Sequence, residues 1–114
     1  MGWQRVAALD DLPEGNAMEV TVADEPICLV RRPDGQVRAV HNICSHEQWS
    51  LHDGWVGDDD IECTLHGSSF DLDTGAPKSL PAVKPVPVYA CKVVDDEILV
   101  DVDQQLNDAP VPRH

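Results

Sequence analysis

Residues 27–40 read ICLVRRPDGQVRAV, two short apolar runs separated by a turn. The runs at residues 27–31 and 37–40 have the length and the β-branched content of strands. Between them, Pro33 and Gly35 supply the backbone dihedrals that a tight turn needs. The stretch therefore predicts a β-hairpin.

Similar short apolar segments recur on both sides of this hairpin. Residues 3–8 and 18–23 read as strands, and residues 86–93 and 97–102 read as a second hairpin. Nine prolines and seven glycines separate the segments, and no long helical pattern occurs. We therefore expect an all-β fold.

The chain has 114 residues, the length of one domain. Within residues 41–80 the strand pattern weakens and Cys, His, Gly, Trp and Asp accumulate, so this segment is the expected functional insertion. A short helical turn around residues 47–51 is compatible with the sequence. Residues 103–114 are polar and contain prolines, which predicts a flexible tail.

The charge of the chain excludes some partners. Eight Lys and Arg against 21 Asp and Glu give a net charge of −13, which argues against nucleic acid or an anionic membrane as partner. The 42% hydrophobic content indicates a folded chain. No apolar run could span a bilayer and the N-terminus shows no secretory signal, so we expect a cytoplasmic protein. An acidic surface suits a basic protein partner, although solubility alone would also explain it.

Two mixed pairs of cysteine and histidine are the strongest chemical signal. Cys44 and His46 form a C-x-H motif, and sixteen residues later Cys63 and His66 form a C-x-x-H motif. Thiolate and imidazole ligands suit zinc or iron–sulfur chemistry, but zinc sites usually pair Cys with Cys and His with His. In a Rieske 2Fe–2S cluster one iron takes two thiolates and the other two imidazoles. One mixed pair on each loop therefore favours this cluster over zinc.

With these motifs the chain resembles the Rieske family, and within it the small Rieske-type ferredoxins, over residues 3–102. Gly67 and the sequence FDLDTG at residues 70–75 follow the second pair as they do in that family, and Pro81 falls where the family has a proline loop. The resemblance implies the Rieske fold, with antiparallel sheets stacked as a sandwich. It also implies that residues 41–80 form a cluster-binding subdomain with two ligand loops.

The resemblance further implies one 2Fe–2S cluster held by Cys44, His46, Cys63 and His66. The chain would then be a soluble one-electron carrier, not itself an enzyme. It would pass electrons from a flavin-dependent NAD(P)H reductase to a terminal oxygenase such as an aromatic-ring-hydroxylating dioxygenase. We expect a monomer whose partners present basic docking surfaces. The alternatives are the small Rieske subunit of an assimilatory nitrite reductase and, in another class, a zinc-stabilised interaction module.

Departures from the high-potential respiratory members bear on the redox potential. Those proteins have a further cysteine in each ligand loop, where this chain has Trp49 and Leu65. They also have a serine and a tyrosine near the cluster, where this chain keeps Ser68 but has Phe70. Fewer hydrogen bonds to the cluster lower its potential. Trp49 and Phe70 could shield the cluster or simply pack in the core.

The remaining candidate residues have less specific interpretations. Cys28 and Cys91 lie in apolar strands, so we expect core residues that form a disulfide only if their strands adjoin. His41 and His52 are expected to form hydrogen bonds or contact solvent, not to bind metal. Trp55 is interpreted as a strand residue that supports the insertion. Residues 58–60, three aspartates, are interpreted as a solvated turn, with an acidic docking patch as the alternative.

Overall fold

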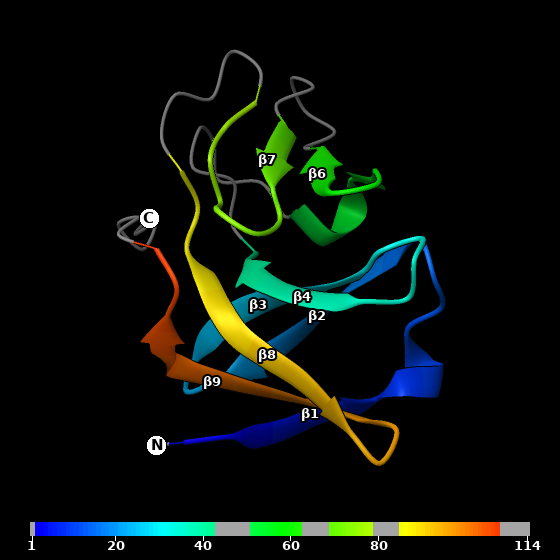
Figure 1. The fold of residues 1–114 in the computed structure, drawn as a ribbon. Coiled ribbons are helices and arrows are strands. Elements are labelled where there is room, and N and C mark those ends of the chain that lie inside the picture. The colour runs from blue at the N-terminus through cyan, green and yellow to red at the C-terminus, as the bar shows by residue number, and fades with distance from the viewer. Residues whose placement is uncertain (1, 43–50, 63–68, 79–84, 108–114) are drawn as a thin grey trace.

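The computed structural model describes residues 2–42, 51–62, 69–78 and 85–107, which form two antiparallel sheets (Figure 1). The larger sheet has the order β1-β9-β8-β4-β3-β2. Its strands are β1 (Gln4–Ala8), β2 (Asn16–Val22), β3 (Glu25–Arg31), β4 (Val37–His41), β8 (Val88–Val94) and β9 (Glu97–Gln105). The smaller sheet consists of β5 (Trp55–Val56), β6 (Asp60–Glu62) and β7 (Ser69–Asp71), in that order. The predicted all-β fold is confirmed.

The helical elements within the described ranges are two single 3-10 turns, η1 (Leu9–Asp11) and η2 (Leu51–Asp53). The second lies next to the helical turn expected around residues 47–51, most of which fall outside the described residues. In the described part of the chain, no helix has the length and apolar character that a bilayer crossing requires.

The hairpin predicted at residues 27–40 is formed by β3 and β4. The two strands pair in continuous register, and Arg31 lies opposite Val37 at the turn. Gly35 donates its N–H to the Arg32 carbonyl at 2.8 Å. Its φ of 93° lies in the left-handed region, where a glycine meets no Cβ clash. The turn residues in the sequence therefore specified this hairpin correctly.

The second predicted hairpin is formed by β8 and β9. Asp95 and Asp96 hold φ values of 52° and 62° at its turn, as a two-residue hairpin turn requires. However, β9 continues through residues 103–105 and places Gln105 opposite Tyr89. The tail therefore does not begin at residue 103 as predicted, because these residues pair within the sheet.

Strand β3 is buried on both faces, which explains its continuous apolar sequence. Cys28 and Val30 face the smaller sheet, whereas Ile27 and Leu29 face the inside of the curled larger sheet, and all four are 0% exposed. The cluster between the two sheets also contains Val40, Leu51, Ile61, Phe70, Leu72, Val86 and Val88. This shared apolar layer holds the smaller sheet on one end of the larger one (Figure 1).

The two cysteines outside the ligand motifs, Cys28 and Cys91, are not joined in a disulfide. Cys28 lies in β3 and Cys91 in β8, and β4 separates these strands in the sheet. The condition for a disulfide is therefore not met, and the prediction that both are core residues holds for buried Cys28 and partly for half-buried Cys91. Burial raises the pKa of the Cys91 thiol to about 12, although Arg38 opposes this shift. At neutral pH this thiol stays protonated and unreactive.

Candidate metal centre

The four predicted cluster ligands lie in two segments whose ends are described. Cys44 and His46 belong to residues 43–50, and Cys63 and His66 to residues 63–68, both outside the described residues. The residues on either side show where each segment leaves the fold and where it returns. The same limit applies to other positions singled out from the sequence: Trp49, Leu65, Gly67, Ser68 and Pro81.

The two ends of the first segment are hydrogen-bonded to each other. Asn42 directly follows β4, and its carbonyl oxygen accepts the Leu51 N–H at 2.7 Å. The Asn42 N–H donates to the Pro26 carbonyl at 2.9 Å. Residues 43–50 therefore leave and return at the end of the β3–β4 hairpin opposite its turn.

The Asn42 side chain is a buried polar clamp that the sequence analysis missed. It is 0% exposed, and its Nδ2 donates to Glu19 Oε2 of β2 at 2.7 Å. Its Oδ1 accepts the His52 N–H at 2.9 Å, and its Nδ2 lies 3.0 Å from His52 Nδ1. The side chain thus ties β2, the end of β4 and η2 together beneath the first segment. Polar residues follow apolar strands in many proteins, so the sequence pattern did not single out Asn42.

We expect Asn42→Ala to lower the free energy of unfolding by about 2 kcal/mol, because the Glu19 carboxylate and the His52 amide lose a buried partner. Denaturant unfolding of the holoprotein, followed by circular dichroism and visible absorption, measures this. The matched control is Asn16→Ala, since the exposed Asn16 side chain donates to the Glu14 carbonyl and has no other hydrogen bond within the described residues. A change within about 0.5 kcal/mol is expected for the control. Equal losses in the free energy of unfolding from the two substitutions would contradict this role of the Asn42 side chain.

The second segment is bracketed by the β6–β7 pair. Glu62, the last residue of β6, lies opposite Ser69, the first residue of β7. One step further from the segment, Ile61 lies opposite Phe70, and both are 0% exposed. The residues before Cys63 and after His66 are therefore held side by side on a buried apolar pair.

A third segment, residues 79–84, leaves from the same place. The Lys78 N–H donates to the Ser69 carbonyl at 2.7 Å, so this segment starts next to the end of the second one. The chain is described again from residue 85, and the Val86 N–H donates to the Gly75 carbonyl at 2.9 Å. The predicted proline loop at Pro81 thus begins beside the second ligand segment.

Gly54 lies where the residues that flank the two ligand segments approach each other. Its N–H donates to the Leu51 carbonyl, at the end of the first segment, at 2.9 Å. A Cβ at Gly54 would lie 1.8 Å from the carbonyl oxygen of Glu62, at the start of the second segment. The backbones of Leu51 and Glu62 therefore approach the same glycine, and only a residue without a side chain permits this approach.

The donor chemistry and these boundaries fit a 2Fe–2S cluster of the Rieske kind. Each segment contains one cysteine and one histidine, which is the donor set of such a cluster. Because the segments leave and return at neighbouring backbone positions, one thiolate and one imidazole from each can serve a single site. The ligand assignment itself stays a prediction.

The aspartates at residues 58–60 are partly neutralised within the fold. Lys78 Nζ lies 3.2 Å from Asp60 Oδ2 and 3.3 Å from Asp59 Oδ1. These contacts, with Asp60 first, raise the pKa of Lys78. Among the described residues Asp58 has no ion pair. The turn predicted at residues 58–60 therefore ends before Asp60, which is the first residue of β6, and both Asp59 and Asp60 are salt-bridged to Lys78.

The two histidines next to the ligand motifs form hydrogen bonds, as predicted. His41 is 1% exposed, and its Nε2 lies 3.1 Å from Glu25 Oε2. His52 contacts Asn42 as described above. Both side chains thus form hydrogen bonds among the residues that flank the first segment.

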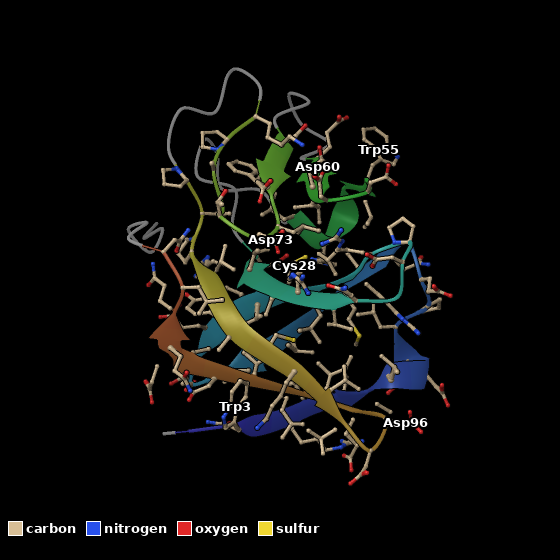
Figure 2. All side chains as sticks on the ribbon, in the orientation of Figure 1. Trp3, Cys28, Trp55, Asp60, Asp73 and Asp96 are labelled. Carbon is tan, nitrogen blue, oxygen red and sulfur yellow. The ribbon has the colours of Figure 1, made fainter. Side chains whose placement is uncertain are left out.

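The aromatic residues of this region have opposite environments. Phe70 is fully buried between the sheets, which confirms its core-packing interpretation. Trp55 lies in β5 as predicted, but its side chain is 63% exposed and points outward (Figure 2). Its predicted supporting role was wrong, because the neighbouring Val56 is the residue that packs on the core.

Comparison with known proteins gives consistent matches. The Rieske [2Fe-2S] domain family matches residues 2–90. The ferredoxin component of biphenyl 2,3-dioxygenase from Rhodococcus jostii (strain RHA1) is 36% identical over 103 residues, which cover 90% of this chain and 95% of that protein.

Solved structures agree with these matches. A chain in the complex of reduced oxygenase and oxidized ferredoxin in carbazole 1,9a-dioxygenase is 33% identical with a TM-score of 0.82, covering 90% of this chain and 94% of that one. A protein from Mycobacterium tuberculosis described as an NADH-dependent nitrite reductase small subunit is 30% identical with a TM-score of 0.79, covering 87% and 93%. The chain thus aligns with nearly the whole length of each.

Proposed function

Because this chain belongs to the Rieske [2Fe-2S] domain family, we propose that it is the ferredoxin component of an aromatic-ring dioxygenase system. It binds one Rieske 2Fe–2S cluster, which when bound accepts and releases single electrons. The observation that carries the proposal is the 36% identity to a dioxygenase ferredoxin component over 95% of that protein's length. Such relatives are electron-transfer components and not catalytic enzymes.

We assign the cluster ligands to Cys44 and Cys63 through sulfur, and to His46 and His66 through nitrogen. The donor set, and the approach of the flanking residues Leu51 and Glu62 to Gly54, support this assignment. We also propose that residues 41–80 act as the cluster-binding part of a single domain spanning 1–114. The family match favours the 2Fe–2S cluster over the zinc-stabilised module considered from sequence.

The proposed partners are a flavin-dependent NAD(P)H reductase and a terminal oxygenase. A relative is in complex with an oxygenase, and the net charge of −13 suits partners with basic docking surfaces. We propose that the chain works as a monomer in the cytoplasm. Docking between such charged surfaces weakens as salt screens it.

Reconstitution of electron delivery tests the proposal. Holoprotein would be mixed with an NADH-dependent flavoprotein reductase and, in turn, the terminal oxygenases of the biphenyl, naphthalene and carbazole systems. We expect substrate-dependent oxygen uptake that requires all three proteins with at least one oxygenase, and that falls between about 50 and about 500 mM salt. No turnover with any of the three would contradict the proposal.

The second candidate is the small subunit of a nitrite reductase. The likeness to such a subunit, at 30% identity and a TM-score of 0.79, favours it as the alternative. A subunit of that kind would stay bound to a large sirohaem protein, whereas a carrier exchanges between partners. Stable co-purification with a sirohaem subunit would therefore choose this candidate.

The redox potential is expected to lie at the low end of the Rieske range, between about −150 mV and about zero. The structure places the fully buried Phe70 on β7, so this position offers no hydroxyl donor to the cluster. Fewer donors to the cluster sulfurs destabilise the reduced state. A spectroscopic redox titration measures the midpoint, and a value above about +200 mV would refute the expectation.

A further inference from the structure

Trp55 is a large aromatic side chain placed in solvent. It is 63% exposed, compared with 38% for Trp3. Tryptophan is the residue type most enriched among energetic anchors of protein interfaces, since it buries a large apolar area and has one polar atom. Its exposure on a short strand therefore suggests a partner that covers it.

The strand register places Trp55 opposite the residue that precedes a predicted cluster ligand. Trp55 lies opposite Glu62, and Val56 lies opposite Ile61. Val56 and Ile61 pack in the core between the sheets, so the pair of Trp55 and Glu62 projects to the other face, away from the core. Glu62 directly precedes Cys63. The exposed ring therefore stands where the second ligand segment leaves the sheet.

The Trp55 backbone is held rigidly. The preceding Gly54 packs against the carbonyls of Leu51 and Glu62, and Trp55 itself pairs with Glu62 of β6. An aromatic side chain on such a fixed backbone loses little conformational freedom when a partner covers it.

The charges around Trp55 are acidic. The turn and strand that follow it present Asp58, Asp59, Asp60 and Glu62. Lys78 contacts Asp59 and Asp60 and so compensates part of this charge. In the described part of the chain, Asp58 and Glu62 have no ion pair. The surface therefore combines an exposed aromatic ring with uncompensated negative charge.

We propose that Trp55, Asp58 and Glu62 form the surface that docks the terminal oxygenase. The complementary site would be an apolar pocket for the indole ring flanked by Lys or Arg side chains. This inference rests on the proposed function and adds the place of contact. The acidic charge disfavours a lipid or nucleic-acid surface. The oxygenase is chosen over the reductase because a relative of this fold is in complex with an oxygenase.

The test compares Trp55→Ala with Trp3→Ala in the reconstituted system. Trp3 is also exposed, but it lies at the opposite end of the molecule (Figure 2), where Lys92 Nζ sits 4.2 Å from its ring centroid. With the oxygenase that accepts electrons from the wild type, we expect Trp55→Ala to raise the KM for this protein about tenfold. The kcat, visible spectrum and midpoint potential should not change. Trp3→Ala should leave the KM unchanged.

Two further variants separate docking from a structural effect. Trp55→Phe keeps an aromatic ring and is expected to stay within about threefold of the wild-type KM. Asp58→Asn should raise the KM at low salt and lose this effect at high salt, because screening removes the attraction.

The outcomes distinguish the two proposals. If wild type drives none of the oxygenases, the proposed function fails. If wild type drives turnover but Trp55→Ala leaves the oxygenase KM unchanged, only the docking surface is refuted. A raised KM confined to the reductase assay would assign the surface to the reductase and would refute the oxygenase as its partner. Loss of visible absorption in both Trp55 variants would show a structural role and also overturn docking.

Discussion

Replacing Cys63 with alanine is expected to abolish the visible absorption of the 2Fe–2S cluster. One thiolate is lost from a set of four ligands, and a Rieske iron requires both of its thiolates. Cys63 directly follows Glu62, the last residue of β6, whereas the described cysteines, Cys28 and Cys91, lie within paired strands of the larger sheet. Iron analysis and the visible spectrum of the purified protein measure the result. His46→Ala is expected to have the same effect.

The matched control is Cys91→Ala. Cys91 is a free thiol on β8, and burial keeps it protonated at neutral pH. Its removal should leave the iron content and spectrum unchanged and cost about 1 kcal/mol of stability. A Cys63→Ala protein with full absorption, or a Cys91→Ala protein without it, would refute the ligand assignment.

Replacing Gly54 with alanine is expected to disrupt the metal centre without touching a ligand. The added Cβ would lie 1.8 Å from the Glu62 carbonyl oxygen and 3.1 Å from the Leu51 carbonyl oxygen. Both are backbone atoms, so β5 and β6 must separate. We expect a loss of about 3 kcal/mol in the free energy of unfolding. A lower iron content per chain should accompany this loss of stability, because Leu51 and Glu62, which flank the two ligand segments, move apart.

Gly57→Ala provides the comparison for this prediction. A Cβ there would meet Asp60 Oδ1 at 2.1 Å, but the backbone oxygen of Asp60 only at 3.8 Å. A side chain can rotate away where a backbone carbonyl cannot, so we expect less than about 1 kcal/mol. Denaturant unfolding gives the free energy of unfolding of both variants, and iron analysis gives their iron content per chain. Equal losses would show that Gly54 has no special role between the segments.

The local parts of the fold were predictable because their causes are local. Pro33 and Gly35 specify the β3–β4 turn, and the apolar runs on both sides specify its strands. The same logic found β8 and β9, but it ended β9 too early. Asp103 and its neighbours are polar, and only their pairing along Tyr89 shows that they belong to the sheet.

The order of the sheet was not predictable in this way. Strand β4 pairs with β8, placing Ala39 opposite Tyr89 across a long stretch of chain. This pairing also separates Cys28 from Cys91 and removes the disulfide alternative. A contact between distant segments depends on both partners at once, so neither segment reveals it alone.

The sequence by itself determined the chemistry of this protein. The mixed pairs of Cys44 with His46 and Cys63 with His66 predict the donor set of a Rieske cluster, because their ligand types and spacing favour this cluster over zinc. Only the tertiary structure decided how the site is supported. Gly54 and Asn42 support the site because groups from residues distant in the sequence contact both of them. Trp55 is exposed because its neighbour Val56, and not Trp55, faces the core, an orientation that is set by packing.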